Sequence, residues 1–223
     1  MPYYSNSLIF FLATCVLVAA CTGRDGFSQQ QIVSVLEEPR HRVVHRDGDL
    51  YLLDVQIPPG DISLPHTHDS AMLYTIIHDE DGPADGVTAS ETEWAERPFT
   101  HEVVNQGPGL LHVIALSNYG LGISKQGGVS GSLANPQLED PWFRSFRIKL
   151  EPGEATTWLA QPNPLVVVQV TEGLAMVMRK NGKATQLAMA GHWAWSEAES
   201  FFRIRNAGSQ AVELVINEGR VSP

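Results

Sequence analysis

Basic residues are scarce in this sequence of 223 residues, which holds 15 Lys and Arg against 25 Asp and Glu and has a formal net charge of -10. No stretch collects the basic residues into a stripe, and this excludes nucleic acid as a partner because phosphate binding needs concentrated positive charge. Long amphipathic helical patterns are also missing. The hydrophobic share of 43% is too high for a disordered chain and is enough for one large or two small globular cores.

Cysteine is equally scarce, since only Cys15 and Cys21 occur. Residues 8–20 form an apolar run that is short for a bilayer span and suits an export signal, although no Lys or Arg precedes it. The run ends in Val-Ala-Ala-Cys, which looks like a bacterial lipobox, so residues 1–21 are expected to be a signal peptide with lipidation at Cys21. The protein would then be an exported lipoprotein, anchored to a membrane of the periplasm or cell envelope. A cleaved signal without lipid is the alternative.

The rest of the chain has the pattern of a β protein. Branched and aromatic runs bounded by turn residues predict strands, whereas the acidic, turn-rich segment 79–86 is expected to be a loop. Residues 119–141 are rich in Gly, Ser, Asn and Pro, and are expected to link a domain at 32–118 to one at 142–220. The strands are expected at residues 50–57, 71–77, 103–104, 110–116, 146–150, 165–171, 174–179, 201–205 and 212–217.

The two halves of the chain resemble each other. Residues 55–61 lie over residues 148–154, and the two segments share a strand, a Pro-Gly turn and an acidic residue. Three further matches occur at a single offset, which a chance similarity rarely produces. They are Trp94 with Trp195, Asn105 with Asn206, and Gly107 with Gly208.

These motifs resemble those of the cupin superfamily, and of its two-domain bicupins in particular. Gly60, five residues and His66-Thr67-His68 match the first cupin motif, and His101 followed after three residues by Asn105 matches the second. The resemblance implies an all-β fold of two tandem cupin barrels, each a jelly roll or double-stranded β-helix. Such barrels leave few sheet edges unpaired.

His66, His68 and His101 are the candidate metal ligands. Residues i and i+2 of a strand share a face, so His66 and His68 both point into the barrel. The resemblance implies that His101 supplies a third nitrogen from a facing strand. Three neutral imidazoles can bind Fe, Zn, Cu or Ni and leave positions open for water, substrate or O₂. One divalent transition metal is therefore the expected cofactor.

The carboxylate ligand of many cupins has no clear counterpart here. Its expected positions are those of Met72 and Leu73, neither of which coordinates a hard cation. Three His without an acid disfavour Mn-type oxalate chemistry and are similar to the three-His cupins, which include O₂-dependent enzymes that cleave diketones or oxidise small thiols. If Met72 takes the ligand position, Tyr74 lies on the same face and is the candidate catalytic residue, as a phenol that orients substrate. A buried core tyrosine is the alternative.

The second half lacks these ligands by the same alignment. His66 and His68 correspond to Leu159 and Gln161, and His101 corresponds to Phe202, so this half is expected to be a metal-free barrel. Its expected role is structural, through packing on the first barrel, cover of a sheet or a contact in a homo-oligomer. His41 and His45 precede the expected first barrel and are not expected in the site.

Three functions fit the cupin motifs and the three candidate ligands, and the cupin fold alone does not decide between them. The first is a metal-dependent oxygenase or lyase that acts on a small organic molecule. The second is a lipoprotein that binds a metal or small ligand without turnover. The third is a sugar- or uronate-processing cupin, which the lack of an evident general acid or base on the inward face disfavours.

Overall fold

The computed structural model describes residues 31–79, 81–123, 133 and 135–220. The expected signal peptide, the lipobox and Cys21 lie outside the described residues, as does part of the expected linker. Within the described part of the chain, no helix is long and apolar enough to cross a membrane. The elements of these residues are strands, apart from one short 3-10 helix, η1 (Glu93–Ala95).

The first half of the chain forms two sheets that face each other. The larger has the strand order β2-β3-β8-β5-β6 and the smaller has the order β1-β4-β7. The strands are β1 (Val33–Ser34), β2 (His41–Asp47), β3 (Leu50–Ile57), β4 (His66–His68), β5 (Ala71–Asp79), β6 (Gly82–Glu91), β7 (Phe99–His101) and β8 (Leu111–Asn118).

The second half repeats this arrangement. Its larger sheet has the order β15-β12-β17-β10-β9 and its smaller sheet the order β11-β16-β13-β14. The chain therefore forms two tandem jelly-roll barrels, which confirms the predicted all-β fold. The strands are β9 (Leu138–Glu139), β10 (Phe143–Leu150), β11 (Leu159–Gln161), β12 (Leu165–Gln169), β13 (Ala175–Arg179), β14 (Ala184–Leu187), β15 (Trp193–Ser196), β16 (Ser200–Asn206) and β17 (Val212–Gly219).

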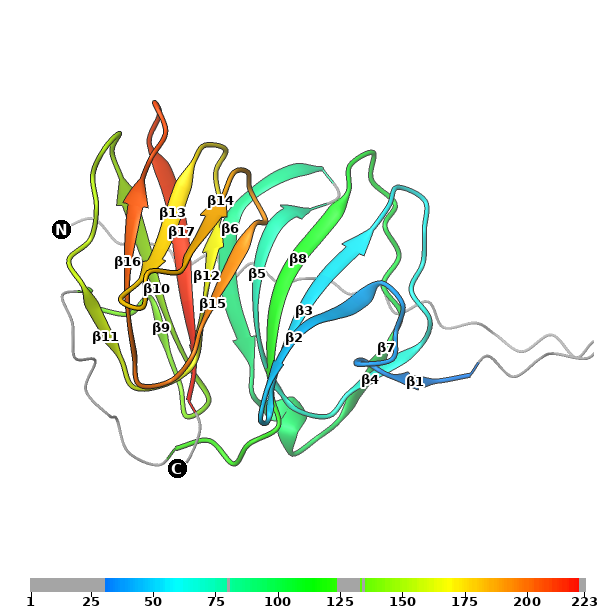
Figure 1. Cartoon of the computed structure of the whole chain (residues 1–223). Helices are drawn as coiled ribbons and strands as arrows, with labels where there is room; N and C mark the ends of the chain where they lie inside the picture. Colours follow the sequence, from blue (N-terminus) through cyan, green and yellow to red (C-terminus); the bar gives the residue numbers. More distant parts are fainter. Residues whose placement is uncertain (1–30, 80, 124–132, 134, 221–223) are drawn as a thin grey trace, which may run out of the picture.

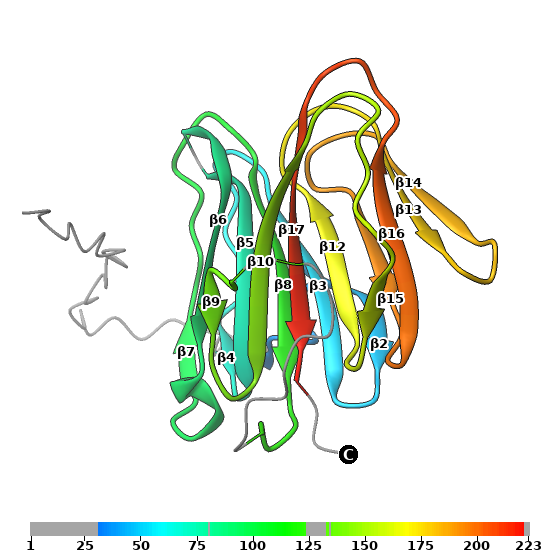
Figure 2. The same cartoon turned by 90° about the vertical axis from the view of Figure 1, so that its left-hand side faces the viewer.

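The two larger sheets pack against each other, so the molecule has four β-layers (Figure 1). β8 and β17 contact each other within this interface, and the view turned by 90° shows them side by side (Figure 2). The shared core is apolar and is drawn from both halves. It includes Leu50, Leu52, Leu73, Ile114 and Leu116 of the first barrel and Phe143, Val166, Val168 and Trp195 of the second.

The layers of this interface approach closely. A Cβ atom at Gly219 would lie 2.6 Å from Cδ1 of Leu50, and one at Gly86 would lie 2.5 Å from Cγ2 of Val170. Hydrogen bonds also join the two halves, and a buried one links the larger sheets directly: the side-chain amide of Asn217 donates to the hydroxyl of Thr75 over 2.9 Å. The larger sheets therefore have both faces covered, one by their own barrel and one by the other barrel.

In each barrel, one buried asparagine side chain bonds to three backbone groups, an arrangement that we call the polar lock. The amide nitrogen of Asn105 donates to the backbone oxygens of Ile57 and Gly109, both at 2.7 Å, and its side-chain oxygen accepts from Gly107 N–H at 3.0 Å. Asn206 repeats the pattern in the second barrel, with bonds to the backbone of Leu150, Gln210 and Gly208. The matched Asn and Gly residues of the two halves thus share one structural role.

The tryptophans of the repeat are not structural counterparts. Val166 pairs with Trp195 in the second barrel, whereas Leu73, which occupies the place of Val166 in the first, pairs with Ser90. Trp94 lies in η1 and packs against the interior of the first barrel, and Trp195 packs between the barrels. Their match at the common offset is therefore a coincidence of sequence.

Several segments differ from the strands expected from sequence. Residues 79–86 were expected to be a loop, but Gly82–Glu91 form β6, which pairs with β5 around a register shift near Ile77. β14 and β15 were not among the expected strands either. β6 is an edge strand of its sheet, a position that tolerates Pro83. Val104 forms only an isolated bridge with Ile62. β9 lies within the range expected to be linker and extends the larger sheet of the second barrel.

We expect Thr75→Val to destabilise the contact between the barrels. Valine has the shape of threonine but cannot accept the amide proton of Asn217, which is 1% exposed, and an unmet buried donor costs about 1–3 kcal/mol. Urea unfolding would measure the loss. Thr67→Val removes a hydroxyl from the exposed Thr67–Thr100 pair and is the control, with an expected change below about 0.5 kcal/mol. Equal stabilities of the two variants would contradict the role of the cross-barrel bond.

We expect Asn105→Ala to lower the free energy of unfolding by about 1–3 kcal/mol or more, because the backbone groups that bond to Asn105 lose their hydrogen-bond partner. Asn206→Ala should have a similar effect, since it breaks the equivalent lock. The exposed Glu102, which lies beside the same segment, provides the control substitution Glu102→Ala. A loss at Asn105 no larger than at Glu102 would refute the lock.

Candidate metal centre

His66, His68 and His101 meet in the interior of the first barrel. β4 pairs antiparallel with β7, and this register places His66 opposite His101. Alternation along β4 turns His66 and His68 inward and Thr67 outward. Nε2 of His68 lies 3.1 Å from Nε2 of His66 and 3.0 Å from Nε2 of His101. The structure therefore brings together the three residues predicted from the cupin motifs.

These separations fit one shared ion. Two nitrogens that bind the same ion at right angles, each about 2.1 Å away, lie about 3.0 Å apart. Nδ1 of His66 donates to the backbone oxygen of Leu64 over 2.8 Å, so the neutral ring carries its lone pair on Nε2. An Nε2–H of His68 could donate to only one of its two neighbours, and its buried Nδ1 has no hydrogen-bond partner among the described residues. A cation bound between the rings would satisfy the remaining lone pairs.

His41 joins this group, contrary to the expectation that it lies outside the barrel. It is the first residue of β2 and is 5% exposed, and its ring centroid lies 4.3 Å from that of His66, with the two rings tilted by 52°. One ring nitrogen from each of His41, His66 and His68 lies within 4.8 Å of the others. Sequence spacing gives no signal for His41, because β2 is brought to the site only by its pairing with β3.

The site keeps its histidines neutral. Burial lowers the pKa of His68 to about 2, with further lowering by the neighbouring His101, His66 and His41. Burial likewise lowers the pKa of His41 and of His101 to about 4, and it lowers the pKa of His66. Neutral imidazole is the form that binds a metal.

Tyr74 lies on the inward face of β5 and packs against the core of the first barrel, and among the described residues it makes no hydrogen bond to the histidines. Burial raises its pKa, and the charge of Glu91 raises it further. Glu91 pairs with Met72, and residues directly opposite in a sheet share a face, so Glu91 also lies on the inward side. Burial, then the nearby Glu93, raises the pKa of Glu91. Met72 packs in the core, which fits the expected absence of a ligand at that position.

Aromatic side chains flank the histidines. Trp94 and Phe99 stack with ring centroids 5.6 Å apart and an interplanar angle of 13°. Trp94 also lies 4.5 Å from the ring of His68, and Phe99 lies 5.0 Å from the ring of His101. Phe99 is 38% exposed, so this aromatic pair reaches from the metal-ligand candidates to the surface.

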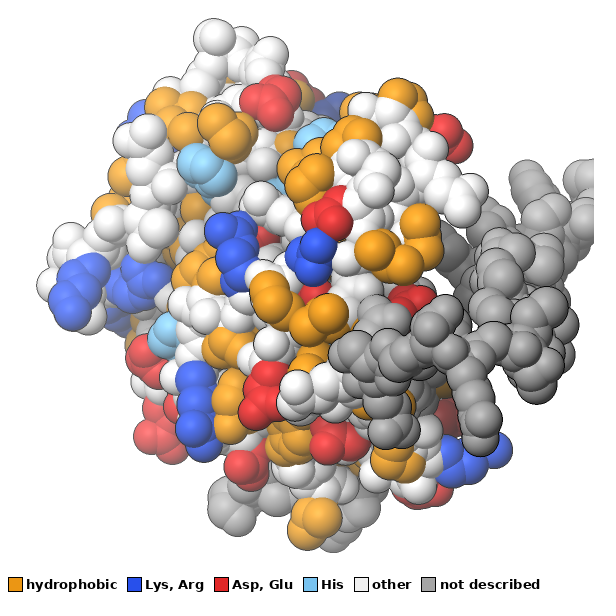
Figure 3. Space-filling model, turned by 90° about the vertical axis from the view of Figure 1, so that its right-hand side faces the viewer, with side chains coloured by type: hydrophobic (Ala, Val, Ile, Leu, Met, Phe, Trp, Pro, Cys, Tyr) orange, Lys and Arg blue, Asp and Glu red, His pale blue; other side chains and the backbone are white. Residues whose placement is uncertain are grey.

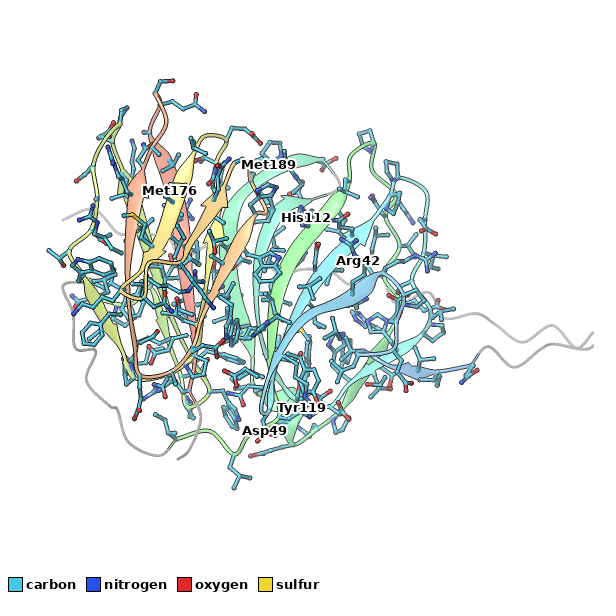
Figure 4. All side chains as sticks on the ribbon, in the orientation of Figure 1. Arg42, Asp49, His112, Tyr119, Met176 and Met189 are labelled. Atoms are coloured by element: carbon cyan, nitrogen blue, oxygen red, sulfur yellow. The ribbon has the colours of Figure 1, made fainter. Side chains whose placement is uncertain are left out.

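The remaining histidines of the first barrel have other roles. His45 follows a register shift in β2 and lies 4.5 Å from the ring of Trp195, so it belongs to the contact with the second barrel. Nε2 of His112 lies 3.0 Å from Asp54, which also pairs with Arg42. Figure 4 shows Arg42 and His112 on the same sheet, well separated along it from Tyr119, which donates to Asp69 at 2.8 Å.

The second barrel has the same strand pairs without these side chains. β11 pairs with β16 in the register of β4 and β7, so Leu159 lies opposite Phe202 where His66 lies opposite His101. Both apolar side chains are part of the core of that barrel. The structural correspondence is the one predicted from the sequence repeat.

The described surface carries few basic side chains, as expected from the scarcity of Lys and Arg in the sequence. On the face shown in Figure 3, the Lys and Arg side chains lie singly or in small groups among acidic and apolar ones, with no continuous basic stripe. Arg40, next to the site, is held by two bonds to Asp61 at 2.6 and 2.8 Å.

No protein-family model and no curated protein matches the chain. Solved structures share its fold. AerE from Microcystis aeruginosa superposes with a TM-score of 0.57 at 11% identity, over 78% of this chain and 89% of that one. Two mutant forms of salicylate 1,2-dioxygenase from Pseudoaminobacter salicylatoxidans, both in complex with gentisate, give TM-scores of 0.52 and 0.54 at 11% and 10% identity, over 76% of this chain and 68% of theirs.

At these identities the similarity concerns the fold alone. The two facing-sheet barrels, the motif residues on β4 and β7 and the superposed structures agree with one another. The chain has the fold of the cupin superfamily, in two tandem copies.

Proposed function

We propose that the first barrel is a metal-dependent enzyme site in which His66, His68 and His101 bind one divalent transition metal. The proposed reaction is the O₂-dependent cleavage or oxidation of a small organic molecule. The observation that carries the proposal is the convergence of three neutral imidazole nitrogens at 3.0 and 3.1 Å in a buried site. The fold shared with a salicylate dioxygenase that binds gentisate supports the choice of reaction class.

A bound metal would supply Lewis acidity toward a carbonyl, enolate or thiolate and, if it is iron, redox chemistry with O₂. The protein supplies orientation. The Leu64 carbonyl fixes the tautomer of His66, and Trp94 and Phe99 offer a flat apolar surface for a substrate. We propose Tyr74 as the residue that orients the substrate, because its raised pKa keeps the phenol protonated and able to donate a hydrogen bond.

Proton transfer in a lyase or a sugar- or uronate-processing enzyme is the second candidate. Glu91 supports it, because this carboxyl lies on the inward side with a raised pKa and near Tyr74. Raised carboxyl pKa values suit a general acid or base near neutral pH. Binding without turnover is the outcome if neither reaction occurs.

The proposed location is the cell envelope, with Cys21 as the lipid-bearing residue. Its support is the sequence alone, namely the apolar run at residues 8–20 and the small residues before Cys21.

We expect the purified chain to bind one divalent transition metal and His68→Ala to lose it, because His68 contacts both other ligand candidates. Elemental analysis measures the metal, and an oxygen electrode measures O₂ uptake by the iron-loaded protein with small diketones and thiols. His78→Ala is the matched control, since His78 lies at the far end of β5.

Absence of a transition metal from a wild-type chain that is folded would contradict the proposed metal enzyme. Bound metal with activity only on uronates or other sugars would favour the second candidate. Bound metal without any turnover would leave a binding protein.

We expect the stability of the metal-free protein to fall as the pH drops from about 6.5 to about 4.5. The unfolded histidines titrate near 6.5, whereas burial holds the folded pKa values of His41 and His101 at about 4 and of His68 at about 2. The unfolded state therefore binds more protons in this range, which lowers the unfolding free energy. Urea unfolding in the presence of a chelator measures it. A His68→Leu variant should show a shallower slope, and equal slopes would contradict the assignment.

A further inference from the structure

The sequence motifs account for three histidines, but a fourth lies against them with its own buried carboxylate. We infer that His41 is a fourth ligand of the metal proposed above, and that Glu38 is the positioning residue that orients both His41 and His66. The inference rests on the proposed metal site and adds to it a donor from β2, outside both cupin motifs.

The position of His41 fits a ligand. A ring nitrogen of His41 lies within 4.8 Å of those of His66 and His68, compared with about 4.2 Å for two nitrogens on opposite sides of one ion. A shift of about 0.6 Å at most would therefore bring the nitrogens of His41, His66 and His68 within reach of one ion. Nδ1 of His41 bonds to Oε2 of Glu38 at 2.8 Å. That bond makes Nδ1 the donor and leaves the lone pair on Nε2.

Glu38 is built to hold a histidine rather than to meet solvent. It is 2% exposed, and its Oε2 accepts the backbone N–H groups of Arg40 at 2.6 Å and His41 at 3.0 Å. Burial disfavours its charge, yet hydrogen bonds from His41, Leu64 and Arg40 lower the pKa of Glu38 below its usual value. The carboxylate is thus charged, and both of its oxygens accept hydrogen bonds from residues around His41 and His66.

The second oxygen of Glu38 is linked to His66 through the backbone of one residue, Leu64. Oε1 accepts the N–H of Leu64 at 3.0 Å, and the carbonyl of Leu64 accepts Nδ1–H of His66 at 2.8 Å. One carboxylate therefore fixes the tautomer of His41 directly and supports that of His66 through Leu64. Arg40 joins Glu38 to Asp61, the residue that follows the Gly60 turn of the first motif.

A simple ion pair between Glu38 and His41 is the structural alternative. The ring centroid of His41 lies 4.3 Å from that of His66 and 6.1 Å from that of His68. A ring that is held by a carboxylate on one nitrogen and lies against two ligand candidates has the arrangement of a metal-binding histidine.

A fourth neutral ligand would set the net charge of the metal site and the number of positions left open for a substrate. Four imidazoles contribute no negative charge, so the ion keeps its full charge toward a bound anion such as an enolate or thiolate. In six-coordinate geometry two positions remain for exogenous ligands. The carboxylate of Glu38 would then act on the ion only indirectly, through its hydrogen bond to the ligand His41.

The test counts imidazoles on the metal in the full chain. Zinc is bound to the wild type, His41→Gln and Glu38→Gln, and X-ray absorption at the zinc edge gives the number of His ligands. We expect four imidazoles in the wild type and three in His41→Gln. Competition with a chromophoric chelator should show an affinity loss of about 10- to 100-fold for Glu38→Gln and at least as much for His41→Gln.

His45→Gln is the matched control, because His45 lies in the same strand but faces Trp195. Circular dichroism and urea unfolding establish that each variant folds. Three imidazoles in the wild type, with zinc affinity unchanged in His41→Gln, would overturn the fourth ligand while leaving the three-His site intact. No bound zinc in the wild type, or none lost on His68→Ala, would instead overturn the proposed metal site itself.

Discussion

Contact between the two larger sheets is the constraint on which the rest of the structure depends. A sheet of half-exposed strands would alternate polar and apolar residues, whereas β12 is buried at every position and β5 and β8 nearly so. Each barrel covers the outer face of the other, and this leaves the inner face of the first barrel free to carry polar ligands. The second barrel, with Leu159 and Phe202 at the ligand positions, supplies hydrophobic burial that a polar interior cannot.

The sequence predicted most of the strands, the two barrels and three of the clustered histidines, because strand alternation and turn-linked motifs are local properties. His66 and His68 share a face through their spacing alone, and His101 follows from the motif ending in Asn105. His41 could not be found this way, since its place depends on how β2 pairs with β3. Glu91 was missed for a similar reason, because β6 lies in a stretch whose acidic and turn residues resemble a loop.

The match between Trp94 and Trp195 shows the limit of a repeat read from sequence. Insertions of different length separate the two motifs in each half, so an offset that is correct for Asn105 and Asn206 is wrong for residues before β7. The polar lock made by these asparagines explains why the offset that relates Asn105 to Asn206 is correct in this part of the two barrels. Each bonds to backbone groups at both ends of a loop, and any change in loop length would break the bonds.

The close approach at Gly219 and Gly86 also bears on how a substrate could enter. Because backbone and side-chain methyl groups are in close contact there, a rotation of the barrels against each other would produce clashes. Three of the four clustered histidines sit on the opposite, smaller sheet or at its edge, with only short strands to hold it. Opening of the centre to a ligand would therefore be a movement of the outer layer, with the second barrel as its fixed support.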